Sequence, residues 1–220
     1  MLKYNKIKYT AFEVKRLSKN LVITIGREFG SKGHAIAKRL SEIMGIKMYD
    51  KDLLSIVAKN HGYSEDILHE IDETATNSFL YALSTGAHTH HTAMFTGIHM
   101  PMTDKAFIAC SQVIKEIAEN ESCIIVGRCA DSILKDHENL FRVFIHADMK
   151  DRVDRICEFE KISRTEATTL IKKQDKKRAS YHNFYADTKW GSTKTYDLCI
   201  NSKIGIEKAA EIIKYAAEHK

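Results

Sequence analysis

The stretch that decides the fold is LVITIGREFGSKGHAIAKRLSEIMG, residues 21–45. Its β-branched beginning predicts a short buried strand. Apolar residues at helical spacing between Ile36 and Met44 predict an amphipathic helix that ends at Gly45. The turn between strand and helix contains Gly26, Gly30 and Gly33. A turn in this setting aims backbone N–H groups and the positive end of a helix at one point, which is a geometry that binds phosphate.

The turn departs from the P-loop pattern G-x-x-x-x-G-K-[ST] at its most diagnostic positions. When the two are aligned on the Gly-Ser pair, the pattern's lysine falls on Gly33, and its Mg²⁺-binding Ser/Thr falls on His34. Its first glycine falls on Arg27, and Lys32 lies one position before the lysine slot. The alternative is that the turn binds no anion and that its glycines serve only to allow positive φ angles in the backbone. The flanking strand and helix favour an anion site made of Arg27, Gly30, Ser31, Lys32, Gly33 and His34.

Length and composition indicate one medium-sized domain in a reducing compartment. The chain has 220 residues and a net charge of +5, which suits an anionic ligand and is too weak to indicate nucleic acid. No apolar run reaches membrane-spanning length, and residues 1–20 read as a poorly anchored extension without the apolar region of a signal peptide. The five scattered cysteines favour free buried thiols and a cytoplasmic location.

Short apolar strands alternate with longer helices, which predicts an α/β fold with a parallel sheet covered on both faces. Further strands are expected at 47–49, 122–126, 141–145 and 196–200. Helices are expected from 51, after 64, and over 103–120, 148–159, 163–185 and 205–217. Ligands of such sheets lie at the carboxyl ends of the strands. Those ends carry the glycine turn, Asp50, Gly127-Arg128 and residues 146–148.

Two interpretations are open for Arg128, for Asp131 and for the helix from 163. Arg128, at the end of an apolar strand, is either a phosphate clamp or a surface ion-pair partner. Asp131 either holds Mg²⁺ or caps the helix expected at 131–135, and Asp50 is also well placed to cap a helix. The helix from 163 carries Arg178 and two tyrosines among lysines, which indicates either a solvated basic face or a lid that closes over phosphates.

Residues 74–103 are poor in charge and rich in Thr, His and Met, which is typical of a mobile flap beside a substrate. Its histidines are His88, His90, His91 and His99. Their spacing, without a neighbouring Cys or acid, is poor for zinc, so no metal site is expected there.

Five stretches taken in order resemble the cytidylate-kinase-like proteins, a divergent branch of the P-loop nucleoside monophosphate kinases. They are GREFGSKG, MYDKDLL, IIVGRCADSIL, VFIHADMKDRVDRI and DKKRASYHNFY with the KWG and YDLCINS that follow it. The resemblance covers about residues 21–216 and implies a three-layer P-loop kinase fold over residues 21–220. It further implies a five-stranded parallel sheet in the order 2-3-1-4-5, a helical insertion that binds the nucleoside monophosphate at about 60–105, and a LID at about 160–190.

The resemblance also implies transfer of the γ-phosphoryl group of ATP to CMP, dCMP or a similar small acceptor, with Mg²⁺. Gly30 and Ser31 match the phosphate loop, and Asp50 matches an acid near the monophosphate. Arg128 matches the arginine that grips the substrate phosphate, and Arg178 matches a lid arginine that reaches the ATP phosphates. The expected catalytic residues are thus Arg128, Asp50 and Arg178, and Asp131 joins Asp50 and Arg128 at the substrate.

The departures from the family pattern leave a second hypothesis open. The loop lacks the lysine and the Ser/Thr, and Val126 stands where true cytidylate kinases have an acid. Loss of a loop cation and a metal ligand would cost several kcal/mol of transition-state stabilisation unless another cation compensates. The alternative is therefore a catalytically impaired regulator that binds a nucleotide or anion on the same fold.

Overall fold

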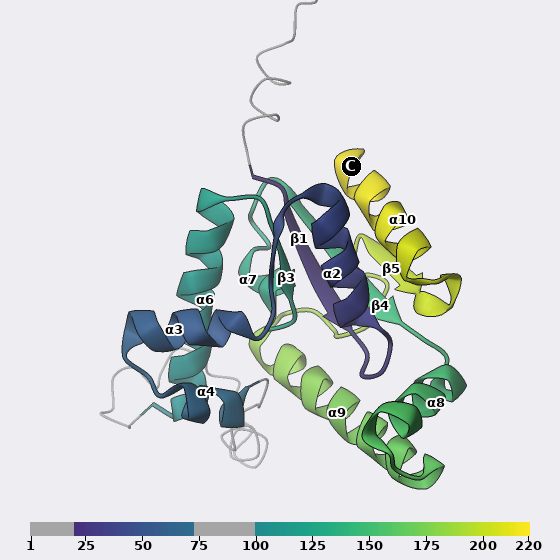
Figure 1. Ribbon diagram of the computed structural model, residues 1–220. Coiled ribbons are helices and arrows are strands. Elements are labelled where there is room, and N and C mark those ends of the chain that lie inside the picture. The colour runs from purple at the N-terminus through teal and green to yellow at the C-terminus, as the bar shows by residue number, and fades with distance from the viewer. Residues whose placement is uncertain (1–19, 73–99) are drawn as a thin grey trace, which may run out of the picture.

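The computed structural model describes residues 20–72 and 100–220. Its centre is a five-stranded sheet in the order β2-β3-β1-β4-β5, and every pairing is parallel (Figure 1). The strands are β1 (Val22–Arg27), β2 (Lys47–Tyr49), β3 (Cys123–Val126), β4 (Leu140–His146) and β5 (Leu198–Asn201). This sheet confirms the expected strand order and places the loop after β1 at the middle of the carboxyl edge.

Helices cover both faces of the sheet and its carboxyl edge (Figure 1). One face is covered by α2 (Gly33–Met44) and α10 (Ile206–Glu218). The other is covered by α3 (Asp52–His61), α4 (Glu65–Ile71), α6 (Met102–Asn120) and α7 (Ala130–Ile133). The remaining elements are α8 (Met149–Glu160), α9 (Arg164–Tyr185) and a 3-10 turn, η2 (Ser202–Ile204).

Alternation along the strands builds the three layers. Val22 packs with α3 and α6, whereas Ile23 and Ile25 pack with α2 and α10. In β3, Ile125 faces the first group and Ile124 the second. Successive strand side chains point to opposite faces, so continuous apolar runs are what a sheet buried on both sides requires.

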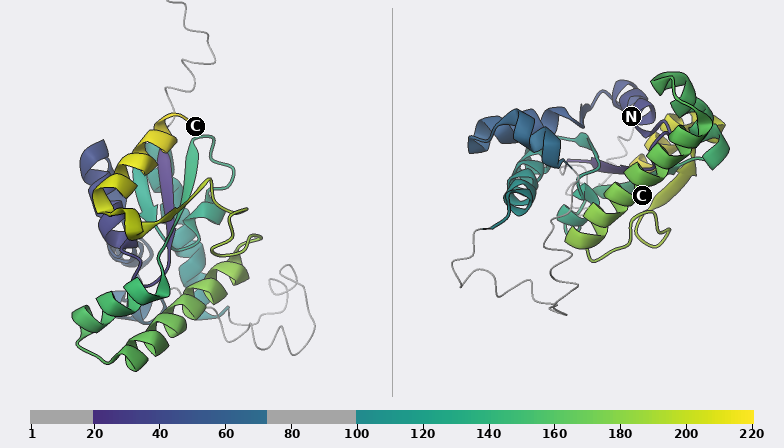
Figure 2. Two further views of the ribbon diagram at one scale, coloured as in Figure 1. Left: turned by 90° about the vertical axis from the view of Figure 1, so that its right-hand side faces the viewer. Right: turned by 90° about the horizontal axis from the view of Figure 1, so that it is seen from below.

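Helices α8 and α9 form a hairpin across the carboxyl ends of the strands (Figure 2). It has a small apolar core of its own, into which Phe29 of the loop after β1 packs. The expected capping box opens α9: Ser163 Oγ accepts from the amide of Glu166, whose carboxylate accepts from the amide of Ser163. The loop after β1 is thus held between the sheet and this hairpin.

Two expectations from the sequence fall outside the described residues: the N-terminal extension, and most of the flap at 74–103 together with its histidines. All five cysteines are free thiols, and Cys110, Cys123 and Cys129 are buried. Within residues 20–72 and 100–220 no helix has the length and apolar character needed to cross a membrane.

Candidate active site at the carboxyl edge of the sheet

The loop between β1 and α2 turns through two residues with positive φ, Gly30 at 77° and Lys32 at 62°. Lys32 caps α2 and occupies the position of the second glycine in the P-loop pattern, where a left-handed conformation is needed. The backbone N–H groups of Lys32, Gly33 and His34 have no acceptor among the residues described. Free amides at the positive end of a twelve-residue helix have the geometry that can bind an anion.

The first part of the loop is fastened to the helical hairpin. The amide of Phe29 donates to Asp175 Oδ1 at 2.8 Å, and Arg152 Nε donates to the carbonyl of Phe29 at 2.8 Å. Arg152 also pairs with Asp175 and, at 3.1 Å, with Glu28. One loop amide is therefore already bound by a carboxylate of the protein, and Asp175 faces the loop. Ser31 is buried, and its hydroxyl has no hydrogen-bond partner in the part of the chain that is described.

Asp50 directly follows β2 and lies beside the last residue of β1, Arg27, and beside His34 in the first turn of α2. His34 Nδ1 is 2.7 Å from its Oδ2, and Arg27 Nη2 is 3.8 Å from its Oδ1. The expectation that Asp50 caps a helix is wrong, since α3 is preceded by Lys51 and has no side-chain cap. Its carboxylate is held instead by the two side chains that replace P-loop residues.

Arg128 follows β3 in a backbone segment that reverses direction, because Gly127, Arg128 and Cys129 all have positive φ. Its guanidinium is 4% exposed and forms a two-pronged pair with Asp72, at 3.0 Å and 3.1 Å. Asp72 directly follows α4. Arg128 is therefore not a surface ion-pair partner but a buried fork that grips an oxyanion.

Asp131 is neither a helix cap nor a partner of Asp50. Helix α7 begins one residue earlier, at Ala130, and is preceded by Cys129. The carboxylate of Asp131 pairs with His182 Nε2 at 2.8 Å, and both side chains are buried. Its acceptor capacity is thus directed at α9. Among the described residues no group of three or more His, Cys, Asp or Glu side chains could hold a metal ion.

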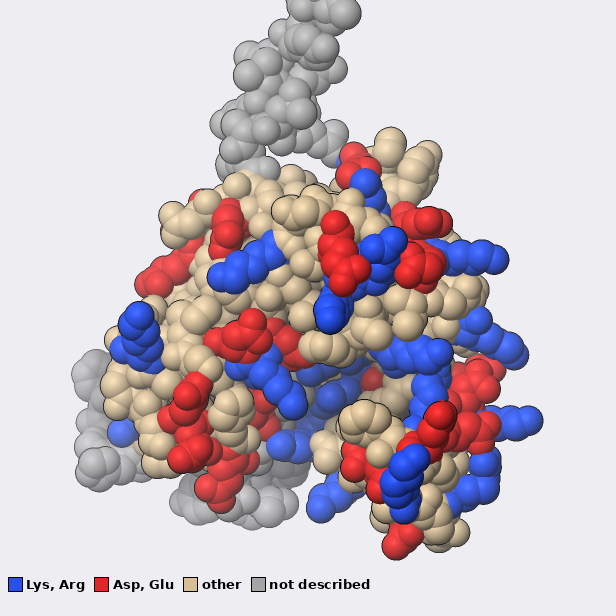
Figure 3. Space-filling model, in the orientation of Figure 1, with Lys and Arg blue, Asp and Glu red and all other residues tan. Residues whose placement is uncertain are grey.

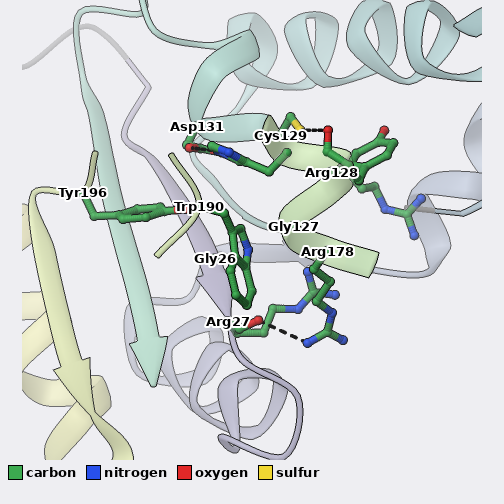
Figure 4. Close-up of a pocket in the computed structure, with 11 residues that line it drawn as sticks. Gly26, Arg27, Gly127, Arg128, Cys129, Asp131, Arg178, Trp190 and Tyr196 are labelled. Carbon is green, nitrogen blue, oxygen red and sulfur yellow. Dashed lines mark hydrogen bonds and ion pairs between the residues drawn. The ribbon is translucent and has the colours of Figure 1, made fainter. Parts of the chain in front are cut away.

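A small cavity is lined by arginines from three separate parts of the chain (Figure 4). Arg27, Arg128 and Arg178 line it with Asp131 and His182, beside the aromatic side chains of Tyr181, Trp190 and Tyr196. Arg178 Nη1 donates to the carbonyl of Arg27 at 3.1 Å, and its guanidinium lies 5.7 Å from the ring centre of Phe29. Burial raises the pKa of both Tyr181 and Tyr196, so these phenols stay neutral.

The cavity has a volume of about 20 Å³, which is room for roughly one water molecule. A nucleotide therefore does not fit inside it. Figure 3 shows a hollow beside it, between the α3–α4 region and the α8–α9 hairpin, where Lys and Arg side chains gather.

The structure thus brings most of the predicted site residues together. The loop residues and Asp50 form one cluster, and Arg27 connects it to the cavity that Arg128 and Arg178 line. The contributions of Asp72 and His182 were missed. His182 carried a signal, because it lies four residues after Arg178 on the same helix face. Asp72 carried none, since no motif marks the end of α4.

Comparisons with known proteins agree with this architecture. The model of the cytidylate kinase-like family matches residues 22–204. An uncharacterized protein from Eubacterium ventriosum, known from its crystal structure, is 32% identical with a TM-score of 0.69, over 91% of this chain and 100% of that one. No curated protein sequence matches significantly.

Two solved kinases share the fold at low identity. Shikimate kinase from Bacteroides thetaiotaomicron is 12% identical with a TM-score of 0.53, over 90% of this chain and 98% of that one. A gluconokinase from Sinorhizobium meliloti is 12% identical with a TM-score of 0.50, over 90% of this chain and 92% of that one. The family match, the strand order and these neighbours together show that the chain belongs to the cytidylate kinase-like family and has the P-loop kinase fold.

Proposed function

We propose that the protein transfers the γ-phosphoryl group of ATP to a small phosphorylated acceptor, a nucleoside monophosphate of the CMP or dCMP type. The observation that carries this proposal is that Arg27 of β1, Arg128 of the loop after β3 and Arg178 of α9 line one cavity at the carboxyl edge. Each of these guanidinium groups carries a positive charge that favours a bound anion nearby. Phosphoryl transfer depends mostly on positioning and on neutralising charge, which is what such a set provides.

The donor end of the reaction rests on the loop after β1. The free amides of Lys32, Gly33 and His34 would bind the β- and γ-phosphates, together with the positive end of α2. Arg178, which already donates to the loop, would add charge from α9 as the hairpin closes. Closure would also exclude water from the γ-phosphate.

The acceptor end rests on Arg128. Its fork now holds the carboxylate of Asp72, and an acceptor phosphate would bind the same fork by displacing that carboxylate. An oxygen of the acceptor phosphate then attacks the γ-phosphorus, and the bond to the bridging oxygen breaks. ADP leaves with that electron pair, and no proton needs to move when the acceptor phosphate is doubly ionised.

Mg²⁺ is usually held by one or two protein carboxylates together with the phosphates of the substrate. Asp50 fits the role of that carboxylate, because it lies at the carboxyl edge of the sheet beside the loop. Both Asp50 and Asp131 pair with a histidine, Asp50 with His34 and Asp131 with His182, so the choice of Asp50 rests on its place beside the loop. His34 offers no oxygen in place of the Ser/Thr hydroxyl. When bound, Mg²⁺ would neutralise charge on the β- and γ-phosphates.

A second candidate function is that of a regulator that binds a nucleotide or anion without transferring phosphate. The observation that favours it is the loop itself, in which Gly33 and His34 replace the pattern's lysine and Ser/Thr and Asp175 takes up the Phe29 amide. Fewer donors would then remain for the transition state than in an intact P-loop.

Calorimetry with ATP, followed by transfer assays across nucleoside monophosphates, separates the two functions. The kinase predicts binding and transfer, the regulator predicts binding alone, and the absence of both contradicts both. Arg128→Ala should abolish turnover and leave ATP affinity largely intact. Arg178→Ala should weaken ATP binding, while Lys173→Ala, an exposed change on the same helix, should not. A fully active Arg128→Ala variant would remove that residue from the mechanism.

A further inference from the structure

We propose that Arg27 is the loop cation of this protein and takes the place, in both space and charge, of the lysine that the P-loop pattern has at position 33. This inference rests on the proposed function and specifies how the altered loop carries it out. It concerns two positions of the P-loop pattern. The first glycine of the pattern is Arg27 in this chain, and its lysine is Gly33.

Steric exclusion links the two positions. A Cβ atom on Gly33 would lie 2.6 Å from Cβ of Arg27 and 2.9 Å from its Cγ, which is closer than side-chain atoms approach one another. Both atoms belong to the stem of Arg27, so rotation of its far end does not relieve the clash. The Arg27 backbone is fixed as well, since it pairs with Ile145 in β4 and its carbonyl accepts from Arg178.

An arginine at position 27 therefore excludes any side chain at position 33. The P-loop pattern uses the opposite choice, a glycine at the first position and a lysine at the seventh. The loss of the lysine and the gain of the arginine are thus one change, and the glycine at 33 is the consequence of the arginine at 27.

The charge of Arg27 lies where a loop cation is needed. Its side chain is 14% exposed and lines the cavity with Arg178 and Arg128 (Figure 4). Figure 4 shows the side chains of Arg27 and Arg178 extending toward the same space from different elements. The alternative cation is Lys32, whose side chain is exposed and does not line this cavity. Its backbone has the left-handed conformation of the second glycine in the P-loop pattern.

A purely structural role for Arg27, as the partner of Asp50, is the competing explanation. The distance of 3.8 Å between Arg27 Nη2 and Asp50 Oδ1 is longer than a hydrogen bond. The nearer partner of Asp50 is His34, at 2.7 Å. The pairing of Arg27 with Asp50 is therefore the weaker of the two, and substitution of Arg27 distinguishes a role toward Asp50 from a role toward phosphate.

The test exchanges the two residues in the full-length protein, with the variants Arg27→Gly, Gly33→Lys and the double variant. Arg27→Gly should lower kcat/KM for phosphoryl transfer about 100-fold, which is typical of losing one transition-state charge partner. It should also weaken the binding of ATP more than that of adenosine. Gly33→Lys alone should lower both Tm and activity because of the clash.

The double variant should recover a large part of the activity and the Tm, because it restores the pattern's glycine and lysine. Arg27→Lys should keep intermediate activity, and Lys38→Ala, an exposed change on α2, should change nothing. If Arg27 served only as the partner of Asp50, Gly33→Lys would not restore the activity that Arg27→Gly loses.

The outcomes separate the inference from the function on which it rests. If the unaltered protein neither binds ATP nor transfers phosphate, the proposed function is wrong. If it binds ATP without transfer, the comparison of ATP with adenosine still tests Arg27. An Arg27→Gly variant with unchanged ATP affinity and turnover overturns the inference alone, as does a folded double variant without rescue. If Lys32→Ala loses about 100-fold in kcat/KM while Arg27→Gly is unaffected, the role of loop cation belongs to Lys32 and the inference about Arg27 is wrong.

Discussion

Arg152 holds the phosphate loop to the helical hairpin, and replacing it with methionine tests how much that attachment contributes. Its side chain is 3% exposed and contacts three groups: the carboxylates of Asp175 and Glu28 and the carbonyl of Phe29. Methionine keeps much of the volume and removes all of these donors. The variant therefore leaves two carboxylates without their shared cation.

The expected loss follows from burial. Removing one member of a buried ion pair destabilises a protein by about 3–5 kcal/mol. The carboxylates are 19% and 24% exposed, so water compensates them in part and the lower end, about 3 kcal/mol, applies. For a domain of this size that corresponds to a fall in Tm of roughly 6–12 °C.

Urea unfolding followed by circular dichroism measures the change. The matched control is Arg164→Met on the same hairpin, whose side chain is 63% exposed and pairs with a half-exposed Asp154. That variant should lose less than about 1 kcal/mol. Equal urea midpoints for the two variants would refute the idea that Arg152 anchors the loop. In the Arg152 variant ATP affinity should fall as well, because Phe29 loses a contact that fixes the loop.

Three further predictions concern other parts of the molecule. Ser163→Ala removes the cap of α9 and should cost about 1 kcal/mol in the free energy of unfolding, measured with urea; no change would contradict the capping box. Burial raises the pKa of Cys110 to about 11 and of Cys123 to about 12, so neither thiol should react with iodoacetamide until urea unfolds the chain, and labelling in the native state would contradict this. Burial alone would raise the pKa of Asp197, but hydrogen bonds from Arg142 outweigh it and lower that pKa, so its contribution to stability is complete at neutral pH and is lost as the pH falls through the lowered value. Asp197→Asn should therefore destabilise the protein at neutral pH and much less in strong acid, and an equal loss at both would disprove the assignment.

Much of the fold could be predicted from local sequence. The β-branched run from Val22, the glycine turn and the periodic helix that follows each depend on neighbours within a few residues. The capping box at Ser163 is likewise a local signal, and it is present. The cap predicted for Asp50 failed because a distant loop competes for its carboxylate.

The site was predictable only in part. The sequence marked Arg27, Arg128 and Arg178 as phosphate-binding candidates. The sheet edge indicated that Arg27 and Arg128 would lie close together, whereas Arg178 was expected there as part of a lid. The partners were not predictable: Phe29 and Asp175 are 146 residues apart, and Arg128 and Asp72 are 56 apart. No periodicity connects such pairs.

By itself the sequence determined the order of strands and helices, the family and the position of the phosphate loop, because these follow from local patterns and ordered motifs. Only the tertiary structure decided that the stem of Arg27 fills the space next to Gly33. It alone also decided that Asp72 pairs with Arg128 and that Asp175 accepts from the amide of Phe29. The physical reason is that such exclusions and pairings depend on distances of a few ångströms, and packing sets those distances between segments far apart in the chain.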